Sequence, residues 1–284
     1  MDRTTLGSVG LMAAAMSLIP IGDAAGKALT GTHGVHPGLV AFARFAVGAA
    51  MVLLILRFRV EGRLYRDPRV WLRAGLIAGG IACILTALRT EPMADTFGAF
   101  FIGPLVSYLL AVLFLGERVT RAQTAALLLG FAGVLLIVRP GFGAGAGLWF
   151  AVAAGTFYGG FLTASRWIGG VYPPLQLMLS QTVAGTVLLA PLAGPGLADP
   201  PAMTAGVAWL LAVSGIASAS GNLLLVFAYR QTDATVLAPF VYTQLASATL
   251  LGWLVFGDWP DATTALGMGV VVAAGVATLM ARRR

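Results

Sequence analysis

The sequence predicts an all-α integral membrane protein with ten transmembrane helices, arranged as two inverted five-helix repeats around a central cavity. Three observations predict this fold: an apolar composition, a series of long apolar runs, and an internal repeat. Of the 284 residues, 58% are apolar and only 10% are charged. A water-soluble domain has about 25% charged residues. Most of this chain must therefore have lipid as its solvent.

Ten apolar runs are each long enough to cross a hydrocarbon layer about 30 Å thick, at about 1.5 Å per residue. We place the predicted helices at residues 6–29, 37–56, 71–89, 94–115, 121–138, 147–166, 174–193, 206–229, 234–256 and 262–281. The first run has no small-residue cleavage site at its end. We interpret it as a membrane span and not as a signal peptide.

The basic residues are distributed unevenly between the two sides of these spans. If the N-terminus is cytoplasmic, the outer side has only Lys27, Arg89 and Arg139, and Arg44 lies within a span. The inner side has Arg3, Arg57, Arg59, Arg63, Arg66, Arg69, Arg73, Arg118, Arg121, Arg166, Arg230, Arg282, Arg283 and Arg284. Because basic loops stay in the cytoplasm, we predict a multi-pass protein of the bacterial inner membrane with both termini cytoplasmic. The net charge of +7 then indicates contact with membrane lipid, and no nucleic acid partner.

The second half of the chain repeats the first at a shift of 141 residues. Ala87-Leu88-Arg89 corresponds to Ala228-Tyr229-Arg230, and Leu113–Arg118 corresponds to Leu254–Trp259. We therefore expect a first repeat at 1–140, a glycine-rich linker at 141–147 and a second repeat at 148–284. An odd number of spans per repeat inverts the second half relative to the first. Inverted halves that can expose a site to either side in turn are typical of transporters.

One segment of this repeat resembles a known family. Pro104 is followed by Leu115-Gly116-Glu117-Arg118 and then by Gly130-Phe131-Ala132-Gly133-Val134, as in the EamA-type domain of the drug/metabolite transporter superfamily. The second copy departs from the pattern, with Leu245 in place of the proline and Asp258 in place of the glutamate. The resemblance covers nearly the whole chain, and within the superfamily the chain is similar to YddG-type bacterial aromatic amino acid exporters.

The resemblance implies a basket of ten helices whose cavity is lined mainly by helices 1, 3, 4, 6, 8 and 9, with helices 5 and 10 as peripheral supports. It also implies export of amino acids, aromatic or neutral, and of related small metabolites by alternating access. The sequence contains no Gly-x-x-x-x-Gly-Lys-Ser/Thr motif for ATP. We therefore expect transport driven by a gradient, without a cofactor, in a chain that is compatible with a monomer.

Aromatic residues recur at helical spacing on one face of predicted helix 4, at Phe97, Phe101 and Tyr108, with Pro104 between them. Under the shift of 141, Phe101 corresponds to Tyr242. We expect these two rings to face each other across the cavity and to hold a planar part of the substrate between them. The alternative is ordinary packing of aromatic rings in a membrane core.

Polar groups at membrane depth are the other candidates for substrate contact. Asn222, Gln244 and the hydroxyl of Tyr158 need hydrogen-bonding partners, which either a substrate or a neighbouring helix can supply. The predicted substrate-binding residues are Phe97, Phe101, Tyr108, Tyr158, Asn222, Tyr242 and Gln244.

Asp23, Lys27 and Arg44 are ionisable residues within the first two spans, and such residues are expensive in a membrane. Asp23 and Lys27 are four residues apart, so they share a helix face. We expect a structural ion-pair cluster of all three residues, with a proton-coupling role for Asp23 as the alternative. The lone Cys83 can form neither an intramolecular disulfide nor a thiolate metal cluster, so no metal site is predicted.

Three other functions compete with amino acid export. A multidrug exporter of the same superfamily would move cationic compounds. A membrane scaffold would have no turnover, although polar residues such as Asn222 argue against so passive a role. A membrane enzyme would need clustered carboxylates or histidines, and the sequence has none at a convincing spacing. We therefore expect the protein not to be an enzyme.

Overall fold

The structure is a computed structural model that describes residues 3–116, 121–139, 145–231 and 237–282. Within these ranges all regular structure is helical. The first half contains α1 (Arg3–Lys27), η1 (Ala28–Thr32), α2 (Pro37–Ile55), η2 (Gly62–Arg66), α3 (Pro68–Leu88), α4 (Met93–Phe100), α5 (Gly103–Leu115) and α6 (Arg121–Val138). The second half contains α7 (Ala146–Trp167), α8 (Pro174–Ala198), α9 (Ala205–Gln231), η3 (Ala238–Tyr242), α11 (Thr243–Leu251), η4 (Gly252–Phe256) and α12 (Ala262–Arg282).

Seven of the described helical segments are long and apolar enough to cross a membrane. They are Leu6–Thr32, α2, α3, the α4–α5 segment, α7, α8 and α9. Three shorter apolar segments, Thr124–Val138, Phe240–Phe256 and Ala262–Ala277, lie where the sequence predicts the remaining spans. The chain is therefore a multi-pass membrane protein.

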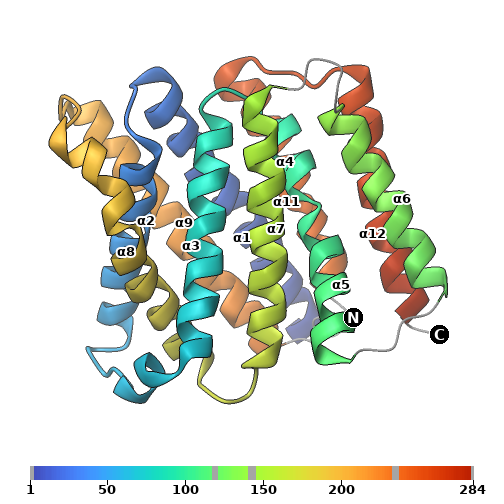
Figure 1. Cartoon of the computed structure of the whole chain (residues 1–284), viewed down its shortest axis with the longest axis horizontal. Helices are drawn as coiled ribbons and strands as arrows, with labels where there is room; N and C mark the ends of the chain where they lie inside the picture. Colours follow the sequence, from blue (N-terminus) through green and yellow to red (C-terminus); the bar gives the residue numbers. More distant parts are fainter. Residues whose placement is uncertain (1–2, 117–120, 140–144, 232–236, 283–284) are drawn as a thin grey trace.

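The helices pack in pairs that join the two halves of the chain. α1 packs along α9, α3 along α7, α2 along α8 and α6 along α12. Figure 1 shows α2 and α8 at one side of the bundle, and α6 and α12 together at the other. Both ends of the chain lie at the same, lower end of the bundle in this view.

The fourth predicted helix is interrupted, contrary to the continuous helix that the sequence predicts at 94–115. α4 ends at Phe100, Phe101 and Ile102 form a turn, and α5 begins at Gly103. Pro104 explains the break, because proline has no N–H to donate to the carbonyl of Phe100 and its ring clashes with that carbonyl. The corresponding place in the second half is also irregular, since η3 ends at Tyr242 and α11 follows.

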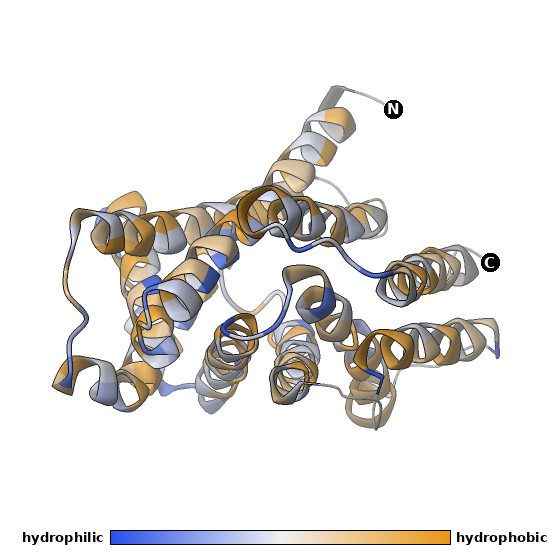
Figure 2. Cartoon of the chain, turned by 90° about the horizontal axis from the view of Figure 1, so that it is seen from above, coloured by the Kyte–Doolittle hydropathy of each residue, from blue (hydrophilic) through white to orange (hydrophobic). Residues whose placement is uncertain are grey.

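Glycines bring α7 very close to the α4–α5 segment. A Cβ atom at Gly159 would lie 2.5 Å from the carbonyl oxygen of Gly103, and one at Gly155 would overlap the carbonyl oxygen of Phe100. Gly155 and Gly159, four residues apart on one face of α7, therefore allow the close approach of this segment. Seen from above, the helices are mostly apolar, and strongly hydrophilic segments gather in the connections and at helix ends (Figure 2).

Candidate functional site

A pocket of about 260 Å³ lies inside the apolar bundle, between α5, α7, α9, η3, α6 and α12. Its walls combine aromatic rings with small residues that leave room for a ligand. The lining residues are Phe101, Pro104, Leu105, Ser107, Tyr108, Ala126, Gly130, Tyr158, Leu162, Arg166, Tyr229, Val241, Tyr242, Val271, Ala274 and Gly275. A mostly apolar cavity with a few polar groups is the usual form of a small-molecule site.

Aromatic contacts give this pocket much of its shape. The ring of Tyr158 lies 5.0 Å from that of Phe100 and 5.9 Å from that of Phe161, measured between centroids. Five lining residues are aromatic, and four of them are tyrosines whose hydroxyls can donate or accept a hydrogen bond. The wall therefore suits a ligand with a planar apolar part and a few polar groups.

Polar side chains of α5 and α7 meet at one part of the pocket wall. Arg166 donates from Nη2 to the Oγ of Ser107 over 2.6 Å, and Thr163 donates from Oγ1 to the Ser107 carbonyl oxygen over 3.2 Å. Arg166 is the only charged residue among the described lining residues. Arg166 and Tyr229 are also exposed, so the pocket reaches that end of the bundle.

Tyr108 has an unusual position in this wall. Its side chain is 9% exposed, and its hydroxyl is buried without a hydrogen-bond partner in the part of the chain that the structure describes. A buried hydroxyl without a partner costs about 1–3 kcal/mol. A ligand group that accepts this hydrogen bond would remove that cost.

Phe101 and Tyr242 both line the pocket, but they do not face each other across an open space. Their rings stack directly, with centroids 5.3 Å apart and planes inclined by 24°. This spacing leaves no room for a third ring, so the expectation of a planar group held between them is wrong for this conformation. The two residues form one wall of the pocket together.

The remaining predicted residues divide between the pocket and its surroundings. Tyr108 and Tyr158 line the pocket, whereas Phe97, Asn222 and Gln244 are not among its described lining residues. Asn222 donates from Nδ2 to the carbonyl oxygen of Ser218, one turn earlier on α9, over 2.8 Å. Gln244 is buried in α11.

Two helices that we expected to be peripheral contribute to the pocket. Predicted helix 5, now α6, supplies Ala126 and Gly130, and predicted helix 10, now α12, supplies Ala274 and Gly275. α1 and α3, which we expected to line the cavity, supply no described lining residue. The reason is that α6 and α12 pack along each other and present small residues to α5 and η3.

Sequence reasoning did not assign Arg166 and Tyr229 to the site. The sequence pattern identifies Arg166 only as an inner basic residue and Tyr229 only as a match within the repeat. A signal was available, because both residues are polar and lie in the last turn of an apolar helix. That signal cannot separate a pocket residue from a residue at the membrane surface.

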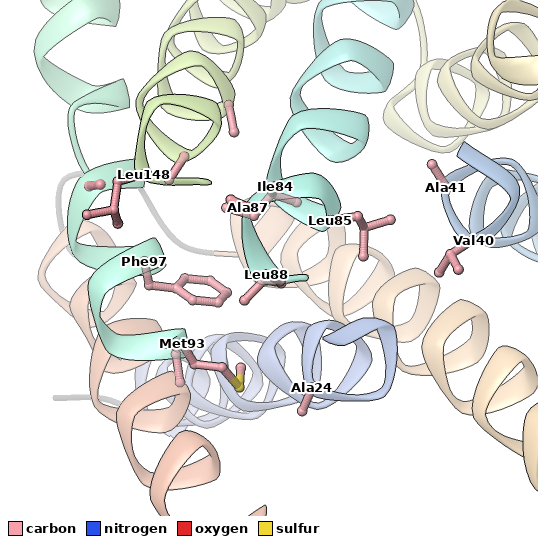
Figure 3. Close-up of a cluster of buried hydrophobic side chains, with 14 of the residues drawn as sticks. Ala24, Val40, Ala41, Ile84, Leu85, Ala87, Leu88, Met93, Phe97 and Leu148 are labelled. Atoms are coloured by element: carbon pink, nitrogen blue, oxygen red, sulfur yellow. The ribbon is translucent and has the colours of Figure 1, made fainter. Parts of the chain in front are cut away.

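Where α3 ends and α4 begins, apolar side chains fill the space between the helices. Phe97, Met93 and Leu88 are each at most 1% exposed, and they gather beside Ala24 between α1, α3 and α4 (Figure 3). Leu245 and Ala248 of α11 belong to the same cluster. We call these six residues, Ala24, Leu88, Met93, Phe97, Leu245 and Ala248, the apolar seal. It explains the position of Phe97, which packs in the seal.

Asp23 and Arg44 form a buried ion pair between α1 and α2. Arg44 Nη1 lies 2.6 Å from Asp23 Oδ1, and the two side chains are only 4% and 5% exposed. Arg44 also donates from Nε to Ser214 Oγ over 2.7 Å and from Nη2 to the Gly22 carbonyl oxygen. These bonds join α1, α2 and α9 at one point.

Lys27 takes a different partner from the one that its spacing predicts. Its Nζ forms an ion pair with Asp258 Oδ2 over 3.1 Å and donates to the carbonyl oxygen of Glu91 over 2.6 Å. The prediction of one cluster of all three residues is therefore wrong for Lys27, which is not paired with Asp23. Lys27 instead connects the end of α1 to the second half of the chain. The Glu91 carboxylate in turn accepts from the N–H of Gly147 at the start of α7, over 3.1 Å.

Comparison with known proteins places this geometry in a family. The sequence pattern of the EamA-like transporter family matches residues 5–139 and again residues 145–280. The chain belongs to the EamA-like transporter family. The two matches cover nearly the whole chain, which agrees with the resemblance of the Pro104–Val134 segment. The Glu117-Arg118 part of that segment lies outside the described residues, as does most of the glycine-rich linker.

Several relatives of this EamA-like chain have named functions. It is 27% identical over 243 residues to the pseudopaline exporter CntI of Pseudomonas aeruginosa, covering 84% of each chain. It is 30% identical over 210 residues to a riboflavin transporter of Rhizobium johnstonii, covering 72% of this chain and 67% of the relative. It is 25% identical over 248 residues to an S-adenosylmethionine uptake transporter of Rickettsia felis, covering 84% and 82%. These relatives are transporters and not enzymes.

A solved crystal structure supports the same fold for this EamA-like chain. It covers 98% of both chains with a TM-score of 0.65, at 22% sequence identity. At this level of identity the likeness concerns the fold alone. The pocket and the apolar seal lie in a chain of the EamA-like transporter family, and their chemistry follows from the residues of this chain.

Proposed function

We propose that this protein is a secondary transporter that exports amino acids, aromatic or neutral, and related small metabolites across the bacterial inner membrane. The observation that carries the proposal is the pocket of about 260 Å³ inside an apolar bundle of the EamA-like family. Its aromatic wall suits a planar side chain, and the Tyr108 hydroxyl suits a hydrogen-bond acceptor such as a carboxylate.

The charge of the pocket lining favours amino acids over cationic drugs as substrates. Arg166 is the charged residue among the described lining residues, and no described lining residue is acidic. A cation in this pocket would therefore have no carboxylate to balance its charge. An amino acid zwitterion has no net charge, because its own carboxylate balances its ammonium group. A scaffold without turnover gives no reason for a pocket that contains a buried hydroxyl without a partner among the described residues.

The proposed architecture has ten spans in two inverted repeats, at 1–140 and 148–284, joined by the linker at 141–147. The pairing of helices supports it. Under the repeat, α1 corresponds to α7 and α3 to α9, so the contact of α1 with α9 corresponds to that of α7 with α3. Likewise α2 with α8 and α6 with α12 are pairs of corresponding helices. A two-fold relation between the halves produces this pattern.

We further propose that both termini are cytoplasmic. The two termini lie at the end of the bundle where α2, α7 and α9 end and α6 begins (Figure 1). In the sequence, these helix ends carry Arg57, Arg59, Arg121, Arg166 and Arg230. This concentration of basic residues at one end is the distribution expected of a cytoplasmic surface. The pocket then reaches the cytoplasmic end, and the apolar seal closes the outer end.

In this proposal, transport alternates between the present inward-facing state and a state in which the seal has opened. Opening the outer end requires the Lys27–Asp258 ion pair to break, because it joins the two halves there. Movement of the two halves toward each other around the pocket, at Tyr108, would close the inner end. Two states of similar energy are what an inverted repeat supplies.

Counterflow in proteoliposomes tests the proposal. Vesicles loaded with unlabelled phenylalanine, tryptophan, threonine or a quaternary ammonium drug are mixed with the matching labelled compound, and uptake is followed. We expect selective exchange of the aromatic amino acids, reduced at least tenfold in Phe101→Ala, because this change removes part of the pocket wall. Phe150→Ala is the matched control, since Phe150 is 45% exposed on α7 and does not line the pocket.

Each other outcome of the counterflow experiment has a distinct meaning. Exchange of the drug alone would retain a transporter but contradict the amino acid assignment. Exchange of no compound, with empty vesicles as the reference, would contradict transport of these classes. Equal loss in Phe101→Ala and Phe150→Ala would show that the pocket is not the route.

A further inference from the structure

The connection between α2 and α3 is a folded surface and not a loose loop. α2 ends at Ile55, and Arg57 and Phe58 follow with left-handed φ angles of 49° and 61°. Such angles cost roughly 1–2 kcal/mol for residues other than glycine, yet the turn is hydrogen-bonded from the Phe58 N–H to the Leu53 carbonyl oxygen over 2.9 Å. The side chains of Arg57 and Phe58 therefore leave the helix end in fixed directions.

Two sets of contacts hold this connection against the helix bundle. Gln176 of α8 donates from Nε2 to the Arg59 carbonyl oxygen over 2.7 Å and accepts from the Glu61 N–H over 3.4 Å. Leu64 is 1% exposed and packs with Val70, Ile168 and Leu177. We call residues 54–66 together with Gln176 the basic platform.

The basic platform presents positive charge around a hollow of about 600 Å³. Arg57, Arg59 and Gln176 line this hollow with Ile55, Leu56, Val60 and Glu61. Glu61 is the acidic residue among them, and Arg63 and Arg66 follow on η2. The described ion pairs of this chain do not include Arg57 or Arg59, whereas Arg69 is paired with Asp67 at 2.7 Å. The platform therefore has unbalanced positive charge.

Apolar side chains stand directly beside these arginines. Leu54 is 65% exposed and Ile55 43% exposed on the last turn of α2, and Phe58 is 69% exposed. In a protein of this class, the side of a membrane-spanning helix faces hydrocarbon, and its end lies at the headgroup level. Arg57 and Arg59 thus lie at the depth of lipid headgroups, with exposed apolar residues leading into the acyl chain region.

We propose that the basic platform binds the headgroup of an anionic phospholipid, whose acyl chains run along Leu54, Ile55 and Phe58. The two arginines match the phosphate in charge and geometry, since a guanidinium can donate two parallel hydrogen bonds to it. The neighbouring apolar side chains favour a lipid over a soluble anion, because only a lipid has acyl chains to cover them. This site is separate from the transport pocket and does not depend on what the pocket binds.

Retention of lipid by the purified full-length protein tests the proposal. The protein is delipidated in detergent, mixed with phosphatidylglycerol or phosphatidylcholine, and examined by native mass spectrometry. We expect the wild type to retain phosphatidylglycerol in preference, and Arg57→Gln/Arg59→Gln to bind it on the order of tenfold more weakly. Phe58→Ser should weaken retention while leaving the charge unchanged.

Arg121→Gln/Arg230→Gln is the matched control, because it removes two exposed arginines from the same end of the bundle outside the platform. Equal loss of phosphatidylglycerol in both double variants, or equal retention of both lipids by the wild type, would overturn the proposal. Displacement of the lipid by glycerol 3-phosphate at equal concentration would show a site for soluble anions and would also overturn it. Size-exclusion profiles confirm that each variant is folded.

Discussion

The rings of Phe101 and Tyr242 stack at 5.3 Å, and the two residues occupy corresponding positions in the two halves of the chain. Each lies where its helical segment is interrupted, Phe101 after α4 and Tyr242 at the end of η3. Both also belong to or pack against the apolar core. The stack therefore lies at the boundary between the pocket and the apolar seal, where a change of conformation must pass.

We predict that the stack couples the two halves energetically. Phe101→Ala and Tyr242→Ala should each lower the free energy of unfolding in detergent. The double variant should lose less than the sum of the single losses, by about 0.5 to 1.5 kcal/mol, which is the usual worth of an aromatic pair beyond its buried area. Chemical denaturation of the four proteins measures this difference.

The control for this cycle uses an aromatic residue away from the stack. Phe150 is on the exposed face of α7, so Phe150→Ala combined with Tyr242→Ala should give additive losses. Additive losses in the Phe101–Tyr242 cycle as well would mean that the stacked rings contribute nothing beyond their separate packing.

The Lys27–Asp258 ion pair should hold the outer end closed. Its side chains are 13% and 31% exposed, so the pair is worth about 1 kcal/mol after screening by solvent. Lys27→Gln should therefore expose the seal roughly two- to fivefold more often. The measurement is labelling of Leu88→Cys by an impermeant maleimide in a Cys83→Ser background, because Leu88 is fully buried in the closed state.

Charge reversal makes this test specific. Lys27→Asp/Asp258→Lys should return the labelling rate toward that of the wild type. Arg89→Gln should leave the rate unchanged, because Arg89 is a basic residue outside the pair. If Lys27→Gln and Arg89→Gln accelerate labelling equally, the outer end responds to net charge and not to this contact.

Variants of the buried Asp23–Arg44 pair distinguish a structural role of Asp23 from proton coupling. Asp23→Asn leaves an uncompensated guanidinium inside the bundle, so we expect a loss of about 3 to 5 kcal/mol in the free energy of unfolding. Asp23→Asn/Arg44→Gln should recover part of this loss and retain transport, if the pair is structural. A stable double variant whose transport no longer depends on a pH gradient would instead identify Asp23 as the coupling carboxylate.

Much of the helical layout could be predicted, because the length of an apolar run determines whether it can span a bilayer. The predicted and observed helices agree within a few residues in most places, for example 37–56 against Pro37–Ile55 for α2. The prediction failed at Phe101 and Ile102. The apolar run alone predicts a continuous helix there, whereas Pro104 breaks the turn that precedes it.

The candidate site was less predictable, because its shape depends on how the two halves meet. Helical spacing put Phe101 and Tyr108 on one face, and both line the pocket. The same spacing also selected Phe97, which lies in the seal on the other side of the helix break. Direct contact of Phe101 with Tyr242 depends on the conformation of the whole chain, which no local pattern contains.

The Arg139–Asp261 ion pair, which joins the end of α6 to the start of α12, should persist in acid until well below pH 4. Arg139 donates to Asp261, and this bond lowers the pKa of the Asp261 carboxyl to about 2. A lowered pKa stabilises the fold above the unfolded value of about 4 and loses this effect as the pH falls through the folded value. The difference in melting temperature between wild type and Asp261→Asn should therefore be equal at pH 7 and pH 5, and should shrink between pH 4 and 2. A difference that already disappears at pH 5 would contradict the pairing.

Gly275 of α12 should control the size of the pocket through Tyr242. A Cβ atom at Gly275 would overlap the Tyr242 hydroxyl, so Gly275→Ala must move this ring, and the ring lines the pocket. We expect counterflow of the best substrate to fall roughly tenfold, about 1.4 kcal/mol in the barrier, with little change in expression. Gly269→Ala is the matched control on the same helix, because an added Cβ there meets no atom within 4 Å. Equal transport by the two variants would show that α12 does not shape the site, and that its role is the peripheral one that the family resemblance implies.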